Sequence, residues 1–349
     1  MNVMRAAMKP SHEDANNGFT FDPSKITDVE SAITALKNVG CEGRNLGNAL
    51  DVLAKMTKEP DCMRVLALSG AMVPAGMEEL LCQLVERGII TALVSTGANL
   101  SHSMINQIGG DNDGQAHYLG SPDADDIDLF KHNICRIYDT YVETDQFADA
   151  DHVLYDLLRE EYPDTNYMVM KPSEFFALLG KFIKARCIFT VAAEHDVPIF
   201  CGATSDSELG LDIMKFRDMY DFTIVLDEIG DIGKFARMIG QHEKHGTIVI
   251  GGGVPRNWTQ QAFPYLENLE LETTGESNSH GYDYSVRFTT AVPDDGGCSG
   301  CTILENISWG KYNERSLHQT VYGDATITFP LIVTALFQLL DKRGDEIEQ

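Results

Sequence analysis

The sequence lacks the features that mark membrane-spanning, secreted and nucleic-acid-binding proteins. No apolar run reaches the roughly 18 residues that a bilayer-spanning helix needs, and Met1–Gly18 contains no stretch typical of a signal peptide. We therefore expect a cytoplasmic protein with no membrane contact. Lys and Arg number 27 against 53 Asp and Glu, which gives a net charge of −26. Phosphate binding needs a basic surface, so this balance argues against nucleic acid as a partner.

The cysteines are not arranged as a disulfide framework. The eight cysteines are scattered, several of them within apolar segments, and they resemble reduced, mostly buried small side chains. Only Cys298-Ser-Gly-Cys301 has a suggestive spacing. A zinc site usually needs a second such pair, and a redox motif normally opens a helix after a strand. We predict no metal site and leave a redox or metal role for Cys298 and Cys301 open.

The chain also lacks a Gly/Ser-rich or Pro-rich linker and an internal repeat, so its 349 residues predict one large domain. Residues 1–25 are polar and irregular, and we expect a flexible N-terminal arm there, with a single domain over residues 26–349. Excess acid suits a cationic substrate, whose approach an acidic field accelerates. Taken alone, the charge fits a solubilising or salt-adapted surface at least as well.

Short apolar runs alternate with longer amphipathic stretches along residues 26–349. The candidate strands are Val65–Leu68, Ile90–Ser95, Pro198–Cys201, Phe222–Leu226, Thr247–Ile250 and Tyr284–Thr289. The candidate helices are Met77–Arg87, Ile127–Val142, Phe147–Glu161, Ser173–His195, Ile232–Gly240, Trp258–Leu266 and Phe329–Lys342. Nearly continuous apolar strands followed by helices are typical of a parallel sheet covered on both faces. The predicted fold is therefore α/β, a Rossmann-like, doubly wound and mostly parallel sheet.

In such a sheet a ligand binds beyond the carboxyl ends of the strands. The segments that follow the apolar runs consist almost entirely of glycine, hydroxyl-bearing and other small residues. They are Ser69-Gly70, Ser95–Asn99, Gly202–Asp206, Gly251–Gly253 and Thr289–Ala291. Glycine lets a ligand approach the backbone, and hydroxyl and N–H groups bind phosphate or ribose. The pattern indicates a nucleotide-sized ligand, although it is not the GxGxxG fingerprint and small residues also suit tight turns.

Lys311 is the candidate nucleophile, because it lies two residues after Trp309. A lysine amine attacks carbonyls and imines only when neutral, and a desolvated site with an aromatic wall lowers its pKa toward that state. Most lysines are solvated surface charges, so this position alone is weak evidence. The nearby Gly251–Gly253 turn and the acidic residues Asp294, Asp295 and Glu305, with Asp324 downstream, strengthen it.

Several motifs together resemble the deoxyhypusine synthase family. They are Ser95-Thr-Gly-Ala, Thr204-Ser-Asp206 with Leu209-Gly210, the triple glycine with Val254, Ser308-Trp-Gly-Lys311 and Val321-Tyr-Gly-Asp-Ala325 followed by Phe329-Pro-Leu. The agreement spans roughly residues 60 to 341, in order and with similar spacings. The resemblance implies a homotetramer with active sites between paired subunits and NAD bound at the strand ends.

By this resemblance the enzyme oxidises spermidine beside its secondary amine, and Lys311 captures the aminobutyl group as an imine while diaminopropane leaves. An acceptor amine then displaces the lysine, and the stored hydride reduces the product imine. Trp309 lies along the alkyl chain of the polyamine, and Glu305 and Asp295 hold its amines. The residues that align with the cofactor shell are Ser69, Thr96, Gly97, Asp206, Gly252, Gly253, Thr290, Ala291, Asp324 and Ala325, and Ser299 also matches.

The chain departs from the family at the substrate pocket. Many protein-modifying members carry a histidine at the position of Asn257 and adjacent glutamates at Ser101 and His102. They carry aspartates at Cys298 and Leu211, and here Asp212 is displaced by one place. We expect Asn257 and His102 to contact substrate. His102 would titrate near neutrality and accept a hydrogen bond from an amine, although a plain core histidine is the simpler alternative.

Three functions remain open from the sequence. The first is an aminobutyl transferase whose acceptor is either a small diamine such as putrescine, giving a homospermidine-type product, or a lysine of the translation factor that carries hypusine. The altered pocket and the short N-terminal arm favour the diamine. The second is a non-catalytic NAD- or polyamine-binding protein, which has little use for Lys311. The third is an NAD-dependent amine dehydrogenase, which would release reduced cofactor without transferring a group.

Overall fold

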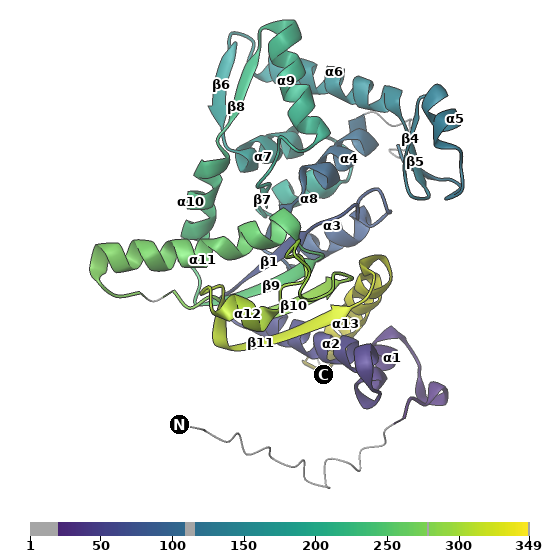
Figure 1. Ribbon diagram of the computed structural model, residues 1–349, viewed down its shortest axis with the longest axis vertical. Coiled ribbons are helices and arrows are strands. Elements are labelled where there is room, and N and C mark those ends of the chain that lie inside the picture. The colour runs from purple at the N-terminus through teal and green to yellow at the C-terminus, as the bar shows by residue number, and fades with distance from the viewer. Residues whose placement is uncertain (1–19, 109–115, 278, 348–349) are drawn as a thin grey trace.

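A six-stranded sheet forms the centre of the computed structural model, which describes residues 20–108, 116–277 and 279–347. The strand order is β11–β10–β9–β1–β2–β7, and every neighbouring pair is parallel (Figure 1). The strands are β1 (Cys62–Leu68), β2 (Ala92–Ser95), β7 (Ile199–Phe200), β9 (Lys244–Ile250), β10 (Tyr282–Thr289) and β11 (Tyr312–Tyr322). The prediction of a parallel α/β sheet is confirmed.

The sheet is doubly wound about the gap between β1 and β9. From β1 the chain proceeds outward to β2 and β7, and it later returns to β9 and continues through β10 to β11 on the other side. The connections after β1 and β9 therefore diverge at the carboxyl edge between these two strands. This is the position at which open α/β sheets bind their ligands.

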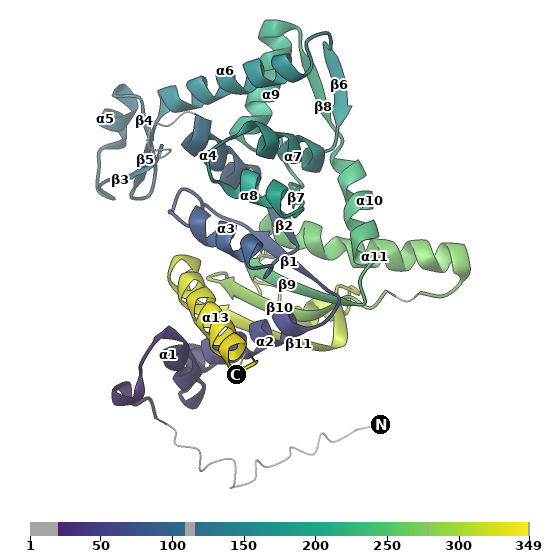
Figure 2. The same ribbon diagram turned by 180° about the vertical axis from the view of Figure 1, so that it is seen from behind.

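Helices cover both faces of the sheet. Alternating side chains of β1 separate the two layers, because Met63 and Val65 pack with one core cluster while Leu66 and Leu68 pack with the other. The first face is covered by α10 (Glu228–Ile239), α11 (Gly253–Thr274) and α12 (Ile303–Ile307). The opposite face is covered by α2 (Cys41–Lys58), α3 (Glu78–Glu86), α8 (Ile188–Glu194) and α13 (Ala325–Ile347), of which Figure 2 shows α2, α3 and α13 in front.

The remaining helices lie around this core. They are α1 (Val29–Ala35), α4 (Gly97–Ile108), α5 (Asp126–Lys131), α6 (Thr144–Glu161), α7 (Pro172–Phe182) and α9 (Glu208–Tyr220), with short 3₁₀ turns at Pro23–Lys25 and Leu36–Asn38. Two smaller sheets complete the chain. An antiparallel sheet joins β3 (Tyr118–Leu119), β5 (Thr140–Glu143) and β4 (Ile134–Ile137), and a parallel pair joins β6 (Tyr167–Met170) and β8 (Thr223–Leu226). The predicted strand at Phe222–Leu226 thus exists outside the main sheet.

One predicted helix is wrong. Residues predicted as a helix over Ile127–Val142 form α5 and the β4–β5 hairpin, which project from the body of the molecule beside α6 (Figure 1). Asn133 and Tyr138 both adopt left-handed backbone angles, with φ of 58° and 56°, and such angles end a helix. The spacing of apolar residues alone could not show these turns.

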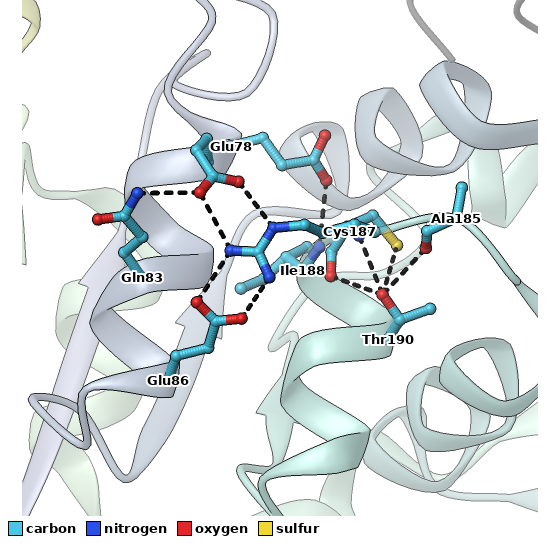
Figure 3. Close-up of polar contacts among 9 residues, drawn as sticks. Glu78, Gln83, Glu86, Ala185, Cys187, Ile188 and Thr190 are labelled. Carbon is cyan, nitrogen blue, oxygen red and sulfur yellow. Dashed lines mark hydrogen bonds and ion pairs between the residues drawn. The ribbon is translucent and has the colours of Figure 1, made fainter. Parts of the chain in front are cut away.

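The predicted helix over Ser173–His195 is two helices, α7 and α8, separated by residues 183–187. Arg186 in this break donates to the carboxylates of Glu79 and Glu86 on α3, while Glu78 accepts from the N–H of Ile188 at 3.3 Å. Figure 3 shows these contacts between α3 and the start of α8. The break therefore connects α8 to α3.

Among the described helices, α13 alone is long and apolar enough by length and composition to cross a membrane. Its residues Phe329, Ile332, Val333 and Leu336 are buried in the core with α2 and the main sheet. A core helix meets the same compositional test. Most of the predicted arm, residues 1–19, lies outside the described residues, so the division into an arm and one domain stays a prediction.

Candidate active site

A cavity of about 470 Å³ lies at the carboxyl ends of β1, β9, β10 and β11. Pockets of this size take nucleotide- or drug-sized ligands. Ser69, Thr290, Asp324 and Ala325, four of the predicted cofactor residues, line it. The sequence segments that follow four separate strands are thus brought to one site, at the divergence between β1 and β9.

Glycines make the backbone accessible at this edge. Gly251 has a φ of +76°, and a Cβ added there would lie 3.3 Å from the Cβ of Ser69. A Cβ on Gly252 would lie 3.1 Å from that of Ser299, and the Ser69 hydroxyl donates to the carbonyl of Gly252. Gly253 begins α11, so the positive end of a 22-residue helix lies at this point. Such a cradle fits the phosphates of a dinucleotide.

The other predicted cofactor residues are not among those that line this cavity. Thr96 and Gly97 follow β2, and Asp206 lies in the connection between β7 and α9. A Cβ on Gly97 would come within 2.5 Å of the Ser207 hydroxyl, so these two connections are in close contact. Ala291 donates its N–H to the Thr289 hydroxyl at 3.1 Å.

Lys311 lies on the α11 face of the sheet, and its backbone precedes β11. Its carbonyl accepts from the N–H of Tyr282, the first residue of β10, so this backbone stands at the amino edge of the sheet. The side chain reaches the first turns of α11, where its Nζ lies 2.9 Å from Oδ1 of Asn257. Its ammonium lies 5.9 Å from the ring centre of Trp309. The structure thus joins Lys311, Asn257 and Trp309, which we name the lysine cluster.

The pKa of Lys311 is lowered from its ordinary value. Burial of its half-buried side chain is the main cause, and the positive charge of Arg256 on the first turn of α11 is the second. Both effects disfavour the ammonium form. The lysine cluster therefore favours the neutral amine that nucleophilic attack needs.

Two buried arginines hold residues 299–301 in place. Arg256 donates to the carbonyls of Ser299 and Cys301 at 3.3 and 2.7 Å. Arg287 on β10 donates to the same two carbonyls and, at 3.1 Å, to that of Gly251. In the described part of the chain, every hydrogen-bond partner of the two guanidinium groups is a carbonyl or the Thr289 hydroxyl. Burial, then the charge of Arg256, lowers the pKa of Arg287 to about 10.

The predicted carboxylates for the substrate lie on either side of this anchored segment. Asp295 is exposed in the turn before it, and its carbonyl accepts from the N–H of Cys298 at 2.9 Å. Glu305 is exposed on α12, where its N–H donates to the Thr302 hydroxyl that caps the helix. Trp309 follows α12 and is 66% exposed. These side chains are open to a substrate or to a second subunit.

His102 has partners away from the lysine cluster. Its Nδ1 lies 2.8 Å from Nε2 of His117, whose Nδ1 lies 2.6 Å from Oδ1 of Asn106, and its ring packs edge-on against Phe147. Burial lowers the pKa of both histidines to about 4, with the His117 ring as a second cause at His102. The expected titration near neutrality is therefore wrong. The predicted contact between His102 and substrate stays a prediction.

Asp212 does not replace the missing carboxylate at Leu211. Leu211 is 60% exposed on α9, whereas Asp212 is buried on the other side of that helix. Burial, followed by the charges of Asp151 and Glu208, raises the pKa of Asp212 to about 8. The one-place displacement therefore turns the carboxylate into the interior.

Several residues at the site could not be recognised from the sequence. Arg256 and Arg287 stand within apolar or helical segments, and the turn at Ile137–Thr140, which lines the cavity, was predicted as helix. Among the described residues no group of three or more His, Cys, Asp or Glu side chains could hold a metal ion. Cys298 and Cys301 are free thiols.

The fold and these sites define an α/β protein with a nucleotide-sized cavity at the carboxyl edge of its sheet and a partly desolvated lysine that contacts α11. The deoxyhypusine synthase family model matches residues 31–336. Probable deoxyhypusine synthase 2 of Methanosarcina mazei is 33% identical over 333 residues, covering 93% of this chain and 92% of that protein. Probable deoxyhypusine synthase 1 of Archaeoglobus fulgidus is 35% identical over 318 residues, covering 91% and 95%. The chain belongs to the deoxyhypusine synthase family, whose chemistry is aminobutyl transfer from spermidine.

Two further likenesses agree with this assignment. A deoxyhypusine synthase-like protein of Chlorobaculum parvum is 31% identical over 326 residues, covering 90% of this chain and 89% of that protein. The crystal structure of an Entamoeba histolytica protein described as a deoxyhypusine synthase superposes with a TM-score of 0.60 at 18% identity, covering 91% of this chain and 96% of that one. At that identity the superposition shows the fold alone.

The first testable consequence concerns the pKa of Lys311. Replacing Arg256 by Gln removes a positive charge, so the pKa of Lys311 should rise and its amine should become reactive only at higher pH. The pH dependence of Lys311 labelling by an amine-reactive reagent, located by peptide mass spectrometry, measures this directly. Arg256→Lys and the exposed Arg315→Gln should keep the parent profile, and circular dichroism checks that each variant is folded. Identical profiles for Arg256→Gln and the parent would contradict the electrostatic coupling.

The second concerns acid stability. Folding lowers the pKa of His102 and His117 from 6.5 to about 4, so the unfolded chain binds more protons in that range. Their contribution to stability is complete above pH 6.5 and is lost as the pH falls toward 4. The double variant His102→Gln/His117→Gln should lose less unfolding free energy over this window than the parent, measured by urea titration. The exposed His132→Gln serves as control, and parallel losses in all three proteins would refute the assignment.

Proposed function

We propose that this protein is an NAD-dependent aminobutyl transferase that takes the butylamine group of spermidine onto Lys311 and passes it to an acceptor amine. The observation that carries the proposal is the Lys311 amine. It is partly desolvated, its pKa is lowered, and it contacts Asn257 about one helical turn from the glycine cradle. An amine in this state, in a chain that also has a nucleotide-sized cavity, suits covalent transfer coupled to hydride chemistry.

The residues at the strand edge fit NAD. The glycine cradle and the N-terminus of α11 would hold the pyrophosphate, and Ser69, Thr290 and Asp324 would contact the sugars. Thr96, Gly97 and Asp206 would extend this shell to the segments that follow β2 and β7. When bound, NAD would supply the hydride acceptor that makes the carbon beside the secondary amine of spermidine electrophilic, and it would return the hydride at the end.

The lysine cluster supplies the transfer chemistry. Neutral Lys311 attacks the carbon of the oxidised donor, the C–N bond to diaminopropane breaks, and Lys311 holds the aminobutyl group as an imine. The incoming amine displaces Lys311 by the same exchange, which involves no net oxidation. Oδ1 of Asn257 accepts an N–H of the lysine and so orients its lone pair. Trp309 would flank the alkyl chain, and Glu305 and Asp295 would hold its terminal ammonium groups.

We propose a small diamine as the acceptor. Ser101 and His102 stand where many protein-modifying relatives carry glutamates, and here Ser101 is buried and accepts from the N–H of Leu209. His102 is held neutral by its surroundings. These two positions therefore carry less negative charge than theirs. A lysine of the translation factor remains the alternative acceptor.

We further propose a homotetramer with sites completed between paired subunits. Large apolar side chains near the lysine cluster and the strand edge are exposed in the single chain. They are Val254, Val292, Leu304, Trp309 and Ile327. Exposed large apolar side chains, where they gather into a patch, mark subunit contacts. A partner subunit would bury these residues and close the site to water.

The proposed chemistry predicts the products of the purified protein. With spermidine, NAD and putrescine, mass spectrometry should detect diaminopropane and homospermidine. In a parallel reaction the precursor of the translation factor replaces putrescine. Transfer to that protein alone would identify its lysine as the acceptor. Reduced cofactor without a transferred group would indicate a dehydrogenase, and NAD binding without any product would indicate a binding protein.

Lys311→Ala should abolish transfer and leave NAD affinity and folding unchanged, because it removes the nucleophile and not the cofactor shell. Borohydride trapping followed by peptide mapping should find an aminobutyl group on Lys311 in the parent and none in the variant. The exposed Lys184→Ala is the control. Equal transfer rates in Lys311→Ala and the parent would end the covalent mechanism.

Shared sites predict complementation between subunits. Ser69→Phe should fill the strand-edge cavity without touching Lys311, so each single variant should be inactive. Mixed assemblies of Ser69→Phe and Lys311→Ala chains, refolded together, should recover part of the parent activity if the cavity and the lysine of one site come from different chains. Well-mixed hybrids with no activity would place each site within one chain.

A further inference from the structure

The β4–β5 turn forms one wall of the strand-edge cavity. Ile137, Tyr138, Asp139 and Thr140 line it opposite Ser69 and the ends of β10 and β11. The hairpin that carries this turn projects beside the sheet (Figure 1). The family motifs do not include these four residues, and they extend the cavity beyond the edge of the main sheet.

Tyr138 holds a backbone conformation that a bulky residue rarely adopts. β4 ends at Ile137 and β5 begins at Thr140, so Tyr138 and Asp139 are the two residues of a tight hairpin turn. Tyr138 has a φ of +56°, and Asp139 is not among the residues with positive φ. Glycine is the usual residue at the first position of such a turn, because a side chain there is strained. A tyrosine at a strained position points to a role for its side chain.

The backbone of the turn is fixed by contacts around it. Arg136 donates to the carbonyl of Tyr138 at 3.0 Å and pairs with the carboxylate of Asp126 through two nitrogens. The N–H of Gly120 donates to the carbonyl of Asp139 at 2.7 Å. The turn is therefore positioned before any ligand binds.

The two side chains of the turn are uncommitted. Tyr138 is 82% exposed, and the carboxylate of Asp139 has no hydrogen-bond or ion-pair partner in the described part of the chain. Among the described residues that line the cavity, Asp139 and Asp324 are the charged ones, and no Lys or Arg is among them. One oxygen of Asp324 already accepts from the N–H and hydroxyl of Thr326 at the start of α13. Asp139 thus supplies the free charge of the cavity.

We propose that Tyr138 and Asp139 bind an adenosine or nicotinamide riboside half of NAD, with Tyr138 stacking on its ring and Asp139 accepting hydrogen bonds from the ribose hydroxyls. The assignment rests on the proposed function, because NAD is the ligand. A carboxylate accepts from a vicinal diol and repels a 2′-phosphate, so Asp139 also makes the site select NAD over NADP. A flat aromatic side chain beside a carboxylate matches a riboside, with its ring and its diol.

The test is to measure the binding of NAD and of NADP to the full chain by calorimetric titration. Tyr138→Gly should weaken NAD binding about tenfold by loss of stacking, and Tyr138→Phe should restore it. Because glycine relieves the strain, the thermal midpoint of Tyr138→Gly should equal or exceed that of the parent. A merely structural tyrosine would not show weaker binding together with unchanged or higher stability.

Asp139→Asn should weaken NAD binding and reduce the preference for NAD over NADP, by about tenfold in the ratio of dissociation constants. Asp149→Asn, an exposed carboxylate on α6, should change neither. Unchanged NAD and NADP affinities in the turn variants would overturn the inference while leaving the proposed function standing. A parent that binds no NAD would overturn both. Spermidine affinity that responds to Asp139→Asn while NAD affinity does not would assign the carboxylate to the polyamine and overturn the inference.

Discussion

The candidate active site depends on two buried arginines that donate hydrogen bonds to the same two carbonyl groups. Arg256 and Arg287 come from α11 and β10, and both donate to Ser299 and Cys301. Burying a guanidinium group is costly unless its N–H groups find acceptors, and in the described chain these acceptors are carbonyls and the Thr289 hydroxyl rather than carboxylates. The segment that follows Asp295 must therefore keep its position for the two arginines to keep these hydrogen bonds. The charge of Arg256 also acts on Lys311.

This arrangement explains how a strongly acidic protein lowers the pKa of a lysine. The net charge of −26 acts at long range and favours the approach of a polycation, but salt screens it over about 10 Å. The pKa of Lys311 is instead governed by burial and by Arg256, which are local. An acidic exterior and a locally cationic interior are compatible because they act over different distances.

The sequence predicted the strands that are buried on both faces. Runs such as Thr247–Ile250 and Tyr284–Thr289 are apolar because helices cover each side, and the small residues after them meet at one edge as parallel topology requires. β11 escaped prediction because it is an edge strand with polar residues such as Asn313, Glu314 and Arg315. Without β11, the backbone of Lys311 could not be placed at the amino edge, with only its side chain directed toward the ligand edge.

The remaining differences arise where tertiary contacts override local pattern. The apolar spacing over Ile127–Val142 suits a helix, yet left-handed angles at Asn133 and Tyr138 divide it into a short helix and a hairpin. Glycine at these positions would have indicated left-handed angles in the sequence, but neither residue is glycine. Contacts from Arg136 and Gly120 to the backbone of the turn provide what the local sequence does not. A turn whose conformation is imposed from outside is free to carry side chains chosen for another purpose, and here those side chains line the cavity.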